Sequence, residues 1–318
     1  MQVLVFGAGA IGSVLGGFLA RAGHEVTLVG RPWHLDAVKA HGLRITGLWG
    51  THIVTGLRTA TRLADAGPPS AYAWVLLTVK AHQTDAAARE LAAWLPARAL
   101  LCALQNGLGN YEALIRHLDP VRVALGRVIF GVELEPGSAH VTVCADDVLL
   151  GAPDRRFPAK PLAELCAALR EAGIPCRLTD DIQGALWSKV LYNCALNGLS
   201  TVLEVPYGGL LDHPIASGFM RRVIDEAYRV AGARGVRLEP PDAAAYLTRL
   251  TTTLIPATAS HRSSMLQDLQ RGKPTEIDAM NGAIVRLGLQ AGVPAPANTL
   301  ITRLVHEKER FAGVSPIL

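Results

Sequence analysis

Short apolar runs alternate with amphipathic segments through the first half of the chain. The runs at residues 2–6, 25–30, 74–79 and 99–104 have the length of buried strands, whereas residues 10–22 and 82–94 have helical spacing. This alternation predicts a parallel sheet covered by helices. Further strands are expected through residues 122–150, with a turn at Pro136 and Gly137 between two of them.

The hydrophobic pattern changes near residue 180. Beyond it, segments of helical periodicity with little β-branched alternation lie at about 181–203, 214–234, 241–254, 260–271 and 276–311. A chain of 318 residues also exceeds the usual size of one domain. We therefore expect a Rossmann-type, doubly wound α/β domain over residues 1–180, followed by an all-α domain over residues 181–318.

Composition excludes several classes of function. The net charge is only +4 and the basic residues are scattered among acids, so no nucleic-acid partner is expected. The apolar opening is rich in glycine and has no basic residue before it, which predicts a strand, a turn and a helix rather than a signal peptide or a membrane span. Five cysteines without a CxxC pair and ten histidines without an HxH or HxxxH pattern predict free thiols, a cytoplasmic protein and no metal site.

The sequence GAGAIG, directly after the first predicted strand, has the GxGxxG spacing of dinucleotide-binding proteins. Such glycines permit a tight turn, close approach of the backbone to a pyrophosphate, and close packing of the following helix on the strand. The N-terminus of that helix would face the negative charge. The candidate cofactor-binding residues in this loop are Gly7, Ala8, Gly9, Ala10, Ile11 and Gly12.

Three further candidates follow predicted strands. After the second strand, where an NAD enzyme carries an acid for the ribose, this chain has Gly30 and Arg31. A guanidinium there suits a 2′-phosphate, which favours NADPH/NADP, although Arg31 could instead cap a helix that begins near Pro32. Lys80 and Asn106 follow two more strands and are expected at the ligand-binding edge of the sheet; the alternatives are a helix-entry lysine and a turn asparagine.

A polar stripe follows one face of the predicted helix at 181–203. Lys189, Asn193 and Asn197 fall within about 80° of one another at 100° per residue, and apolar residues occupy the opposite face. Lysine, with an unperturbed pKa of about 10.4, can stabilise an alkoxide and then protonate it. The amides can bind substrate oxygens without adding negative charge. The alternative is a partly solvated helix face.

A third polar cluster occupies residues 261–282. Ser264 with Gln267, and Thr275 with Asp278, have the spacing of capping boxes, so local capping is one explanation of these hydroxyls. Capping does not explain Glu276. Its carboxylate could orient Lys189 or bind a ribose hydroxyl of the cofactor; alternatively it is an exposed residue of a first helical turn.

Taken together, these motifs resemble the ketopantoate reductase (2-dehydropantoate 2-reductase) family over nearly the whole chain. The most specific parts are GAGAIG, the arginine after the second strand, the VK and QNG strand ends, WSKVLYNCALN and SSMLQDLQRGKPTEID. The resemblance implies NADPH-driven reduction of 2-dehydropantoate to pantoate, a step of pantothenate biosynthesis. Lys189 would be the proton donor, Asn193, Asn197 and Ser264 would bind the substrate, Asn106 would lie near cofactor and substrate, Lys80 near the cofactor, and Glu276 against the ribose or the lysine. A homodimer is implied by the resemblance only.

Two departures from the family pattern bear on the substrate. Tyr207 stands in a stretch where the family often has a further asparagine, and His261 stands where an asparagine commonly precedes the SSM motif. A different small 2-oxo acid, handled by a related 2-hydroxy-acid dehydrogenase, is therefore the main alternative. The alternative of another class is a non-catalytic NADPH-sensing protein, against which the intact lysine and asparagine stripe argues.

Overall fold

The computed structural model describes residues 1–314. The chain forms two compact units. The α/β unit contains Met1–Asn106 and Asn110–Ile182. The helical unit contains Gly107–Gly109 and the chain from Gln183 onward.

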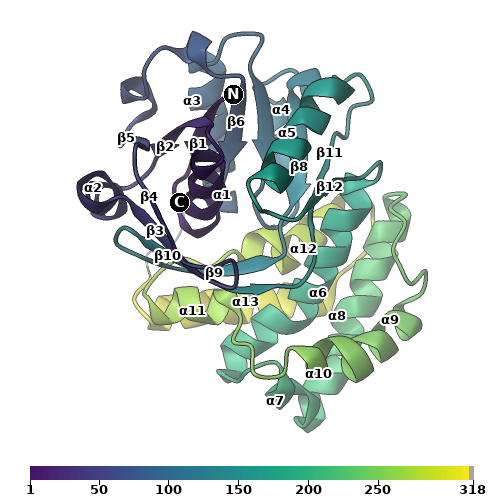
Figure 1. Ribbon diagram of the computed structural model, residues 1–318. Coiled ribbons are helices and arrows are strands. Elements are labelled where there is room, and N and C mark those ends of the chain that lie inside the picture. Colours follow the sequence, from purple (N-terminus) through teal and green to yellow (C-terminus); the bar gives the residue numbers. More distant parts are fainter. Residues whose placement is uncertain (315–318) are drawn as a thin grey trace. The chain divides into compact units, whose positions relative to one another are not determined.

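The main sheet of the α/β unit has eight strands within the described residues, in the order β12-β11-β8-β7-β6-β1-β2-β5 (Figure 1). All neighbouring pairs are parallel except β8 with β11, which are antiparallel. The parallel α/β fold predicted from the sequence is confirmed, while the reversal at β11 was not predicted. The strands are β1 (Gln2–Phe6), β2 (Glu25–Val29), β5 (Arg58–Ala60), β6 (Trp74–Leu77), β7 (Leu100–Ala103), β8 (Val123–Arg127), β11 (Val148–Gly151) and β12 (Cys176–Leu178).

A second, four-stranded sheet in the same unit has the order β4-β3-β10-β9. It combines β3 (Leu43–Gly47) and β4 (His52–Val54) with β9 (Phe130–Glu135) and β10 (Ser138–Cys144). The predicted turn at Pro136 and Gly137 joins β9 to β10. The sequence did not indicate that strands so far apart along the chain form a separate sheet.

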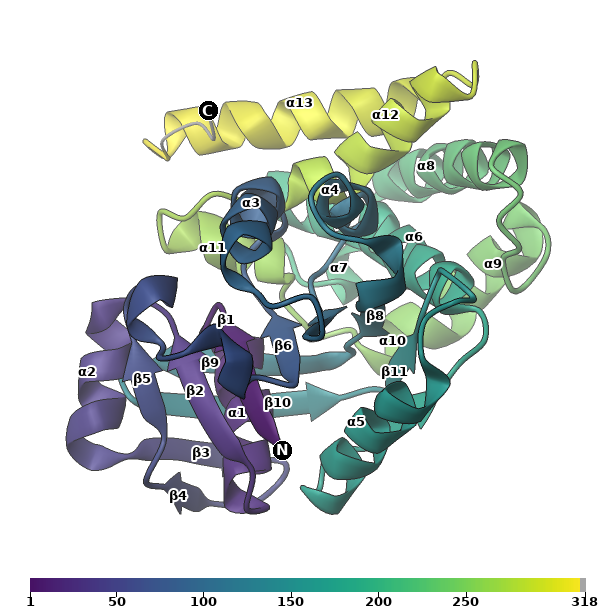
Figure 2. The same cartoon turned by 90° about the horizontal axis from the view of Figure 1, so that it is seen from above.

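Helix α1 (Ala10–Arg21) packs between the two sheets of the α/β unit. A Cβ at Gly16 would lie 2.6 Å from Leu28 Cδ2 of the main sheet, and one at Gly17 would lie 2.6 Å from Ile45 Cδ1 of the small sheet. Adjacent glycines therefore let the helix approach both sheets closely. The remaining helices are α2 (Pro32–His41), α3 (Thr84–Trp94), α4 (Asn110–Ile115) and α5 (Ala159–Glu171), of which α3 and α4 lie on the opposite face of the main sheet from α5 (Figure 2).

The helical unit is built from helices and short helical turns. Its longer helices are α6 (Ile182–Leu203), α8 (Pro214–Ala233), α12 (Asn281–Gln290) and α13 (Pro296–Phe311), with shorter α7 (Gly208–Leu211), α9 (Ala243–Arg249), α10 (Ile255–Ala257) and α11 (Ser264–Gln270). A buried carboxylate joins two of them, because Glu226 of α8 accepts hydrogen bonds from the backbone N–H groups of Ala297 (2.8 Å) and Asn298 (2.9 Å) in the first turn of α13. Acceptors at this end satisfy N–H groups that have no partner within the helix.

Three predicted helical segments have different boundaries in the structure. The segment at 276–311 is divided between α12 and α13, because Gly292 has φ of 69° and Pro294 and Pro296 follow it. The segment at 260–271 becomes helical only from Ser264, and the segment at 241–254 passes from α9 into π-helical geometry at Leu250–Leu254. Among the helices of residues 1–314, none combines the length and the apolar character that crossing a membrane requires.

Candidate active site

The candidates of the α/β unit all lie beyond the carboxyl ends of adjacent parallel strands. The glycine loop follows β1 directly, Arg31 follows β2, Lys80 follows β6 and Asn106 follows β7. In the sheet these four strands are neighbours, in the order β7-β6-β1-β2. The fold thus brings the four predicted positions to the one edge where doubly wound sheets bind ligands.

The glycine loop is fixed by the strand beside it. Thr78, just after β6, donates a side-chain hydrogen bond to the carbonyl oxygen of Gly7 at 2.8 Å. A Cβ at Gly7 would lie 2.4 Å from Val79 N, and one at Gly12 would lie 2.5 Å from Thr78 Oγ1. Internal packing therefore accounts for Gly7 and Gly12. The sequence motif did not reveal Thr78, although it directly precedes the VK pair.

Gly9 has no such internal explanation. A Cβ at this position would meet, within 4 Å in the described structure, only the carbonyl oxygen of Gly7, at 3.8 Å, and φ is −93°, which other residues adopt readily. The residue stands at the N-cap of α1, where no side chain caps the helix and the first turn has no acid. Open space over an uncapped helix N-terminus suits the close approach of a pyrophosphate, so the loop fits a dinucleotide.

Arg31 lies at the N-cap of α2, where it is exposed and makes no capping hydrogen bond through its side chain. The structure therefore does not support a capping role for the guanidinium. Gly30 comes close to the glycine loop, because a Cβ there would lie 2.9 Å from Ala8 Cβ. A side chain at position 30 would press on the loop, which makes Arg31 the first residue after β2 that can offer a functional group.

Polar side chains brace the ends of β6 and β7. Gln105 donates to Thr84 Oγ1 at 2.6 Å, and Asn110 Nδ2 donates to the backbone oxygen of Asn106 at 2.9 Å. Gln105 is only 7% exposed, and its Oε1 has no hydrogen-bond partner among residues 1–314. A buried acceptor at the ligand edge could receive a hydrogen bond from a bound molecule. Sequence reasoning overlooked this glutamine.

In the helical unit, the polar stripe runs along α6 as the sequence indicated. The apolar residues expected on the opposite face are buried, namely Trp187, Leu191, Cys194, Ala195 and Leu199. Lys189 and Asn193 are partly exposed, whereas Asn197 is 2% exposed. Ser200, which falls on the same arc, donates to the carbonyl oxygen of Val205 at 2.7 Å and so serves the end of the helix. A solvated face accounts neither for the buried asparagine nor for the buried serine.

The two asparagines of the stripe differ in their partners. Within residues 1–314, the side chain of Asn193 makes no hydrogen bond. Asn197 accepts a hydrogen bond from the hydroxyl of Tyr207 at 2.6 Å and donates one to Met280 Sδ at 3.5 Å. The first amide is available to a ligand, and the second is held by the protein.

The two family departures, Tyr207 and His261, contact one another. Their rings are 5.1 Å apart, and the backbone N–H of Tyr207 donates to the carbonyl oxygen of His261 at 3.0 Å. Burial raises the pKa of Tyr207 and lowers that of His261. At neutral pH we therefore expect a neutral phenol at Tyr207 and a neutral imidazole packed against it at His261.

The structure does not support the local explanations offered for Ser264 and Glu276, namely helix capping and an exposed position in a first helical turn. The side chain of Ser263, not that of Ser264, caps α11 by accepting from the backbone N–H of Leu266 at 3.1 Å, so the alternative in which Ser264 caps this helix is wrong. Ser264 is exposed in the first turn. Glu276 is 7% exposed, which overturns the alternative of an exposed first-turn acid.

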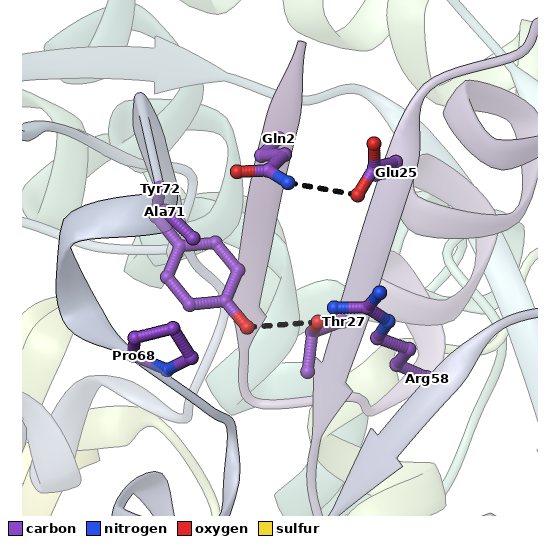
Figure 3. Close-up of a pocket in the computed structure, with 7 residues that line it drawn as sticks. All are labelled: Gln2, Glu25, Thr27, Arg58, Pro68, Ala71 and Tyr72. Carbon is purple, nitrogen blue, oxygen red and sulfur yellow. Dashed lines mark hydrogen bonds between the residues drawn. The ribbon is translucent and has the colours of Figure 1, made fainter.

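A small pocket in the α/β unit lies at the amino ends of the strands, away from the carboxyl ends that the candidate residues follow (Figure 3). Gln2, Glu25 and Arg58 are the first residues of β1, β2 and β5, and Tyr72 closes one side by donating to Thr27 Oγ1 at 2.9 Å. Ligands of such sheets bind beyond the carboxyl ends of strands. The pocket is at the amino ends, so it is not the candidate active site. No group of three or more potential metal ligands is gathered anywhere in residues 1–314.

Comparison with known proteins matches both parts of the chain. The family model "Ketopantoate reductase PanE/ApbA" matches residues 3–155, and its C-terminal counterpart matches residues 181–309. The 2-dehydropantoate 2-reductase of Aquifex aeolicus is 37% identical over 312 residues, which cover 98% of each chain. That of Archaeoglobus fulgidus is 33% identical over 310 residues, covering 97% of this chain and 98% of the relative.

Solved structures agree with this result. A PanE/ApbA family ketopantoate reductase from Ralstonia eutropha has a TM-score of 0.86 and 36% identity, over 98% of this chain and 100% of that one. D-mandelate dehydrogenase, in a ternary structure with NADH and anilino(oxo)acetate, has a TM-score of 0.85 and 27% identity over 99% and 100% of the two chains. The fold and the glycine loop place the protein among two-domain Rossmann-type proteins. Within that class, the chain belongs to the ketopantoate reductase family.

Proposed function

We propose that the protein is an NADPH-dependent oxidoreductase that reduces 2-dehydropantoate to pantoate, with Lys189 as the proton donor. The observation that carries the proposal is the stripe on α6, in which a lysine and an asparagine without a side-chain hydrogen bond in the described residues lie one turn apart, opposite a buried apolar face. Membership of the ketopantoate reductase family supports the same reaction. Glu276, a buried carboxylate in the same unit, is proposed to orient the lysine or to bind a ribose hydroxyl.

A bound nicotinamide cofactor would supply a hydride to the carbonyl carbon of the 2-oxo acid. The oxygen that becomes negative as the hydride arrives needs a cation and a proton, and a lysine ammonium offers both. We assign the binding of substrate oxygens to Asn193, Asn197 and Ser264, and assign Asn106 to both ligands. Neutral amide and hydroxyl donors bind a carboxylate without adding charge that would repel it.

For the cofactor we propose the glycine loop as the pyrophosphate site, with Lys80 close by and Arg31 on a 2′-phosphate. The open space over Gly9 and the exposed guanidinium of Arg31 support this assignment. An arginine can bind a phosphate with two parallel hydrogen bonds, so a guanidinium at this position would favour NADPH over NADH.

The test is oxidation of NADPH by the purified protein with 2-dehydropantoate, beside NADH and beside a Lys189→Arg variant. We expect fast turnover with NADPH, weaker use of NADH, and a loss of kcat of about 100-fold or more in the variant, since a guanidinium keeps the charge but does not release its proton. Turnover that survives in Lys189→Arg would remove lysine from the mechanism.

A second candidate is a 2-hydroxy-acid dehydrogenase for a bulkier or aromatic acid. The ring of Tyr207, whose hydroxyl bonds Asn197, the ring of His261 packed against it, and the likeness to D-mandelate dehydrogenase favour it. A panel that includes phenylglyoxylate separates the two candidates, because activity with the aromatic acid alone keeps the chemistry and changes the substrate. Tight NADPH binding without turnover of any acid would instead identify a sensor.

A further inference from the structure

The hydroxyl of Tyr207 and the amide of Asn197 form a buried pair. The hydroxyl lies 2.6 Å from Asn197 Oδ1, and the two residues are 3% and 2% exposed. Burial raises the pKa of Tyr207, so its phenol keeps the proton and donates it. The amide oxygen of Asn197 is therefore committed to the tyrosine, and the amide nitrogen must point the other way.

Tyr207 is itself held firmly. Its ring packs edge-on against Tyr192, with centroids 5.8 Å apart. The same ring also contacts the ring of His261. Backbone hydrogen bonds anchor the same segment, from Tyr207 N to the oxygen of His261 and from Gly208 N to the oxygen of Ala259 at 2.8 Å. The tyrosine thus ties the segment after α6 to the loop that leads into Ser263 and α11.

The amide nitrogen of Asn197 is left with spare donor capacity. It carries two N–H groups, and the only acceptor it meets among residues 1–314 is the sulfur of Met280, a weak one. A nearly buried donor that lacks a good acceptor is unfavourable unless a ligand supplies one. Asn193, one turn earlier, has no side-chain hydrogen bond in the described structure and can turn either end of its amide toward a ligand.

We propose that Tyr207 is a positioning residue that fixes the amide of Asn197 as a hydrogen-bond donor, so that Asn197 selects an acceptor oxygen of the substrate, either of its carboxylate or of its carbonyl. This inference rests on the proposed function, because it specifies which kind of substrate atom Asn197 can bind. The role belongs to a residue that the family pattern alone would suggest is merely a departure.

The kinetic test compares Tyr207→Phe with Tyr192→Phe. Both remove one hydroxyl from the same aromatic cluster, but the hydroxyl of Tyr192 pairs with Thr258 Oγ1 at 2.9 Å and does not touch Asn197. We expect Tyr207→Phe to raise KM for the 2-oxo acid about tenfold, the size of one lost hydrogen bond, while kcat changes little. Tyr192→Phe should leave KM unchanged.

A double variant separates positioning from general loosening of the fold. If the tyrosine acts through the amide, adding Tyr207→Phe to Asn197→Ala should raise KM no further. The inference is overturned if Tyr207→Phe leaves KM of the otherwise unchanged protein as it was. It is equally overturned if the substitution raises KM by the same factor when Asn197 is already absent.

A measurement without turnover keeps the inference testable if the proposed function fails. In ¹⁵N-labelled protein without substrate, the side-chain NH₂ signal of Asn197, assigned by its loss in Asn197→Ala, should stay protected from exchange in Tyr192→Phe and exchange faster in Tyr207→Phe. Protection that survives in Tyr207→Phe would refute the positioning role. Absence of turnover with every 2-oxo acid in the unmodified protein would refute the proposed function alone.

Discussion

The hydroxyl oxygen of Ser263 accepts a hydrogen bond from the backbone N–H of Leu266 at 3.1 Å, which makes it the N-cap of α11. Its neighbour Ser264 is exposed and is left free of the capping role. The two adjacent serines can therefore be distinguished by the quantity that each substitution changes.

Ser263→Ala should lower the free energy of unfolding by about 1 kcal/mol, the usual cost of removing a serine cap. Ser264→Ala should leave stability almost unchanged and raise KM for the 2-oxo acid severalfold, since we assign it to the substrate. Urea unfolding and steady-state kinetics on both variants check this. The reverse result, with stability lost at Ser264, would contradict the observed cap.

Substitutions at two glycines of the GAGAIG loop should have different effects on stability. In Gly12→Ala the new Cβ would lie 2.5 Å from Thr78 Oγ1 and 2.6 Å from the Gly7 oxygen, so we expect destabilisation of about 1–3 kcal/mol. Gly9→Ala has open space at the Cβ and should fold as stably as the unmodified protein.

The cost of Gly9→Ala should appear in cofactor binding instead. A methyl group over the helix N-terminus keeps a pyrophosphate away from the backbone, so we expect NADPH affinity to fall about tenfold or more, equivalent to at least about 1.4 kcal/mol. Fluorescence titration with NADPH measures this. Unchanged affinity in a stable Gly9→Ala protein would argue against the loop as the pyrophosphate site.

The preference for NADPH over NADH should depend on Arg31, and a substitution at Gly30 should not reverse it. Arg31→Ala should raise KM for NADPH about tenfold or more, the loss of a charge-assisted hydrogen bond, and leave KM for NADH nearly unchanged. Gly30→Asp should not create an NADH enzyme, because its Cβ would crowd Ala8 in the glycine loop. Kinetics with both cofactors test the pair, and equal effects of Arg31→Ala on NADPH and NADH would contradict the 2′-phosphate assignment.

Stability should depend on pH through His306. Burial alone would lower the pKa of this histidine, but hydrogen bonds to Glu309 (2.8 Å) and Asp278 (3.0 Å) outweigh that effect and raise it. Since the folded pKa lies above the ordinary value of 6.5, the stabilisation is complete below about pH 6.5 and is lost as the pH rises through the raised value.

Urea unfolding across this range in the unmodified protein and in His306→Gln measures the contribution. We expect the difference in stability between the two proteins to shrink as the pH increases. A constant difference for His306→Gln would show that the imidazolium adds nothing.

The sequence predicted those features that depend on neighbours along the chain. Strand, glycine loop and helix follow one another from Gln2 to Arg21, and the stripe on α6 follows from helical periodicity alone. Pairings between distant segments were not visible in this way. Ile45 pairs with Ala139 in the small sheet, and nothing in five residues such as 43–47 specifies a partner more than ninety positions away.

The same distinction between local patterns and contacts of distant segments applies to the residues of the candidate site. The shared helix face of Lys189, Asn193 and Asn197 could be predicted because all three residues belong to one helix. The hydrogen bond from Tyr207 to Asn197 could not be predicted, since it depends on how the chain turns after α6. For the same reason the burial of Glu276 and the choice between Ser263 and Ser264 as cap required coordinates.

The placement of α1 between two sheets has a thermodynamic consequence for whatever its N-terminus binds. Gly16 and Gly17 bring the helix close to Leu28 of the main sheet and to Ile45 of the small sheet, so the first turn has little freedom to shift when a ligand arrives. A binding site that is already ordered loses little conformational entropy on association, and more of the gross interaction energy is retained as affinity. Enlarging either glycine should therefore weaken ligand binding from a distance of two helical turns, through mobility rather than contact.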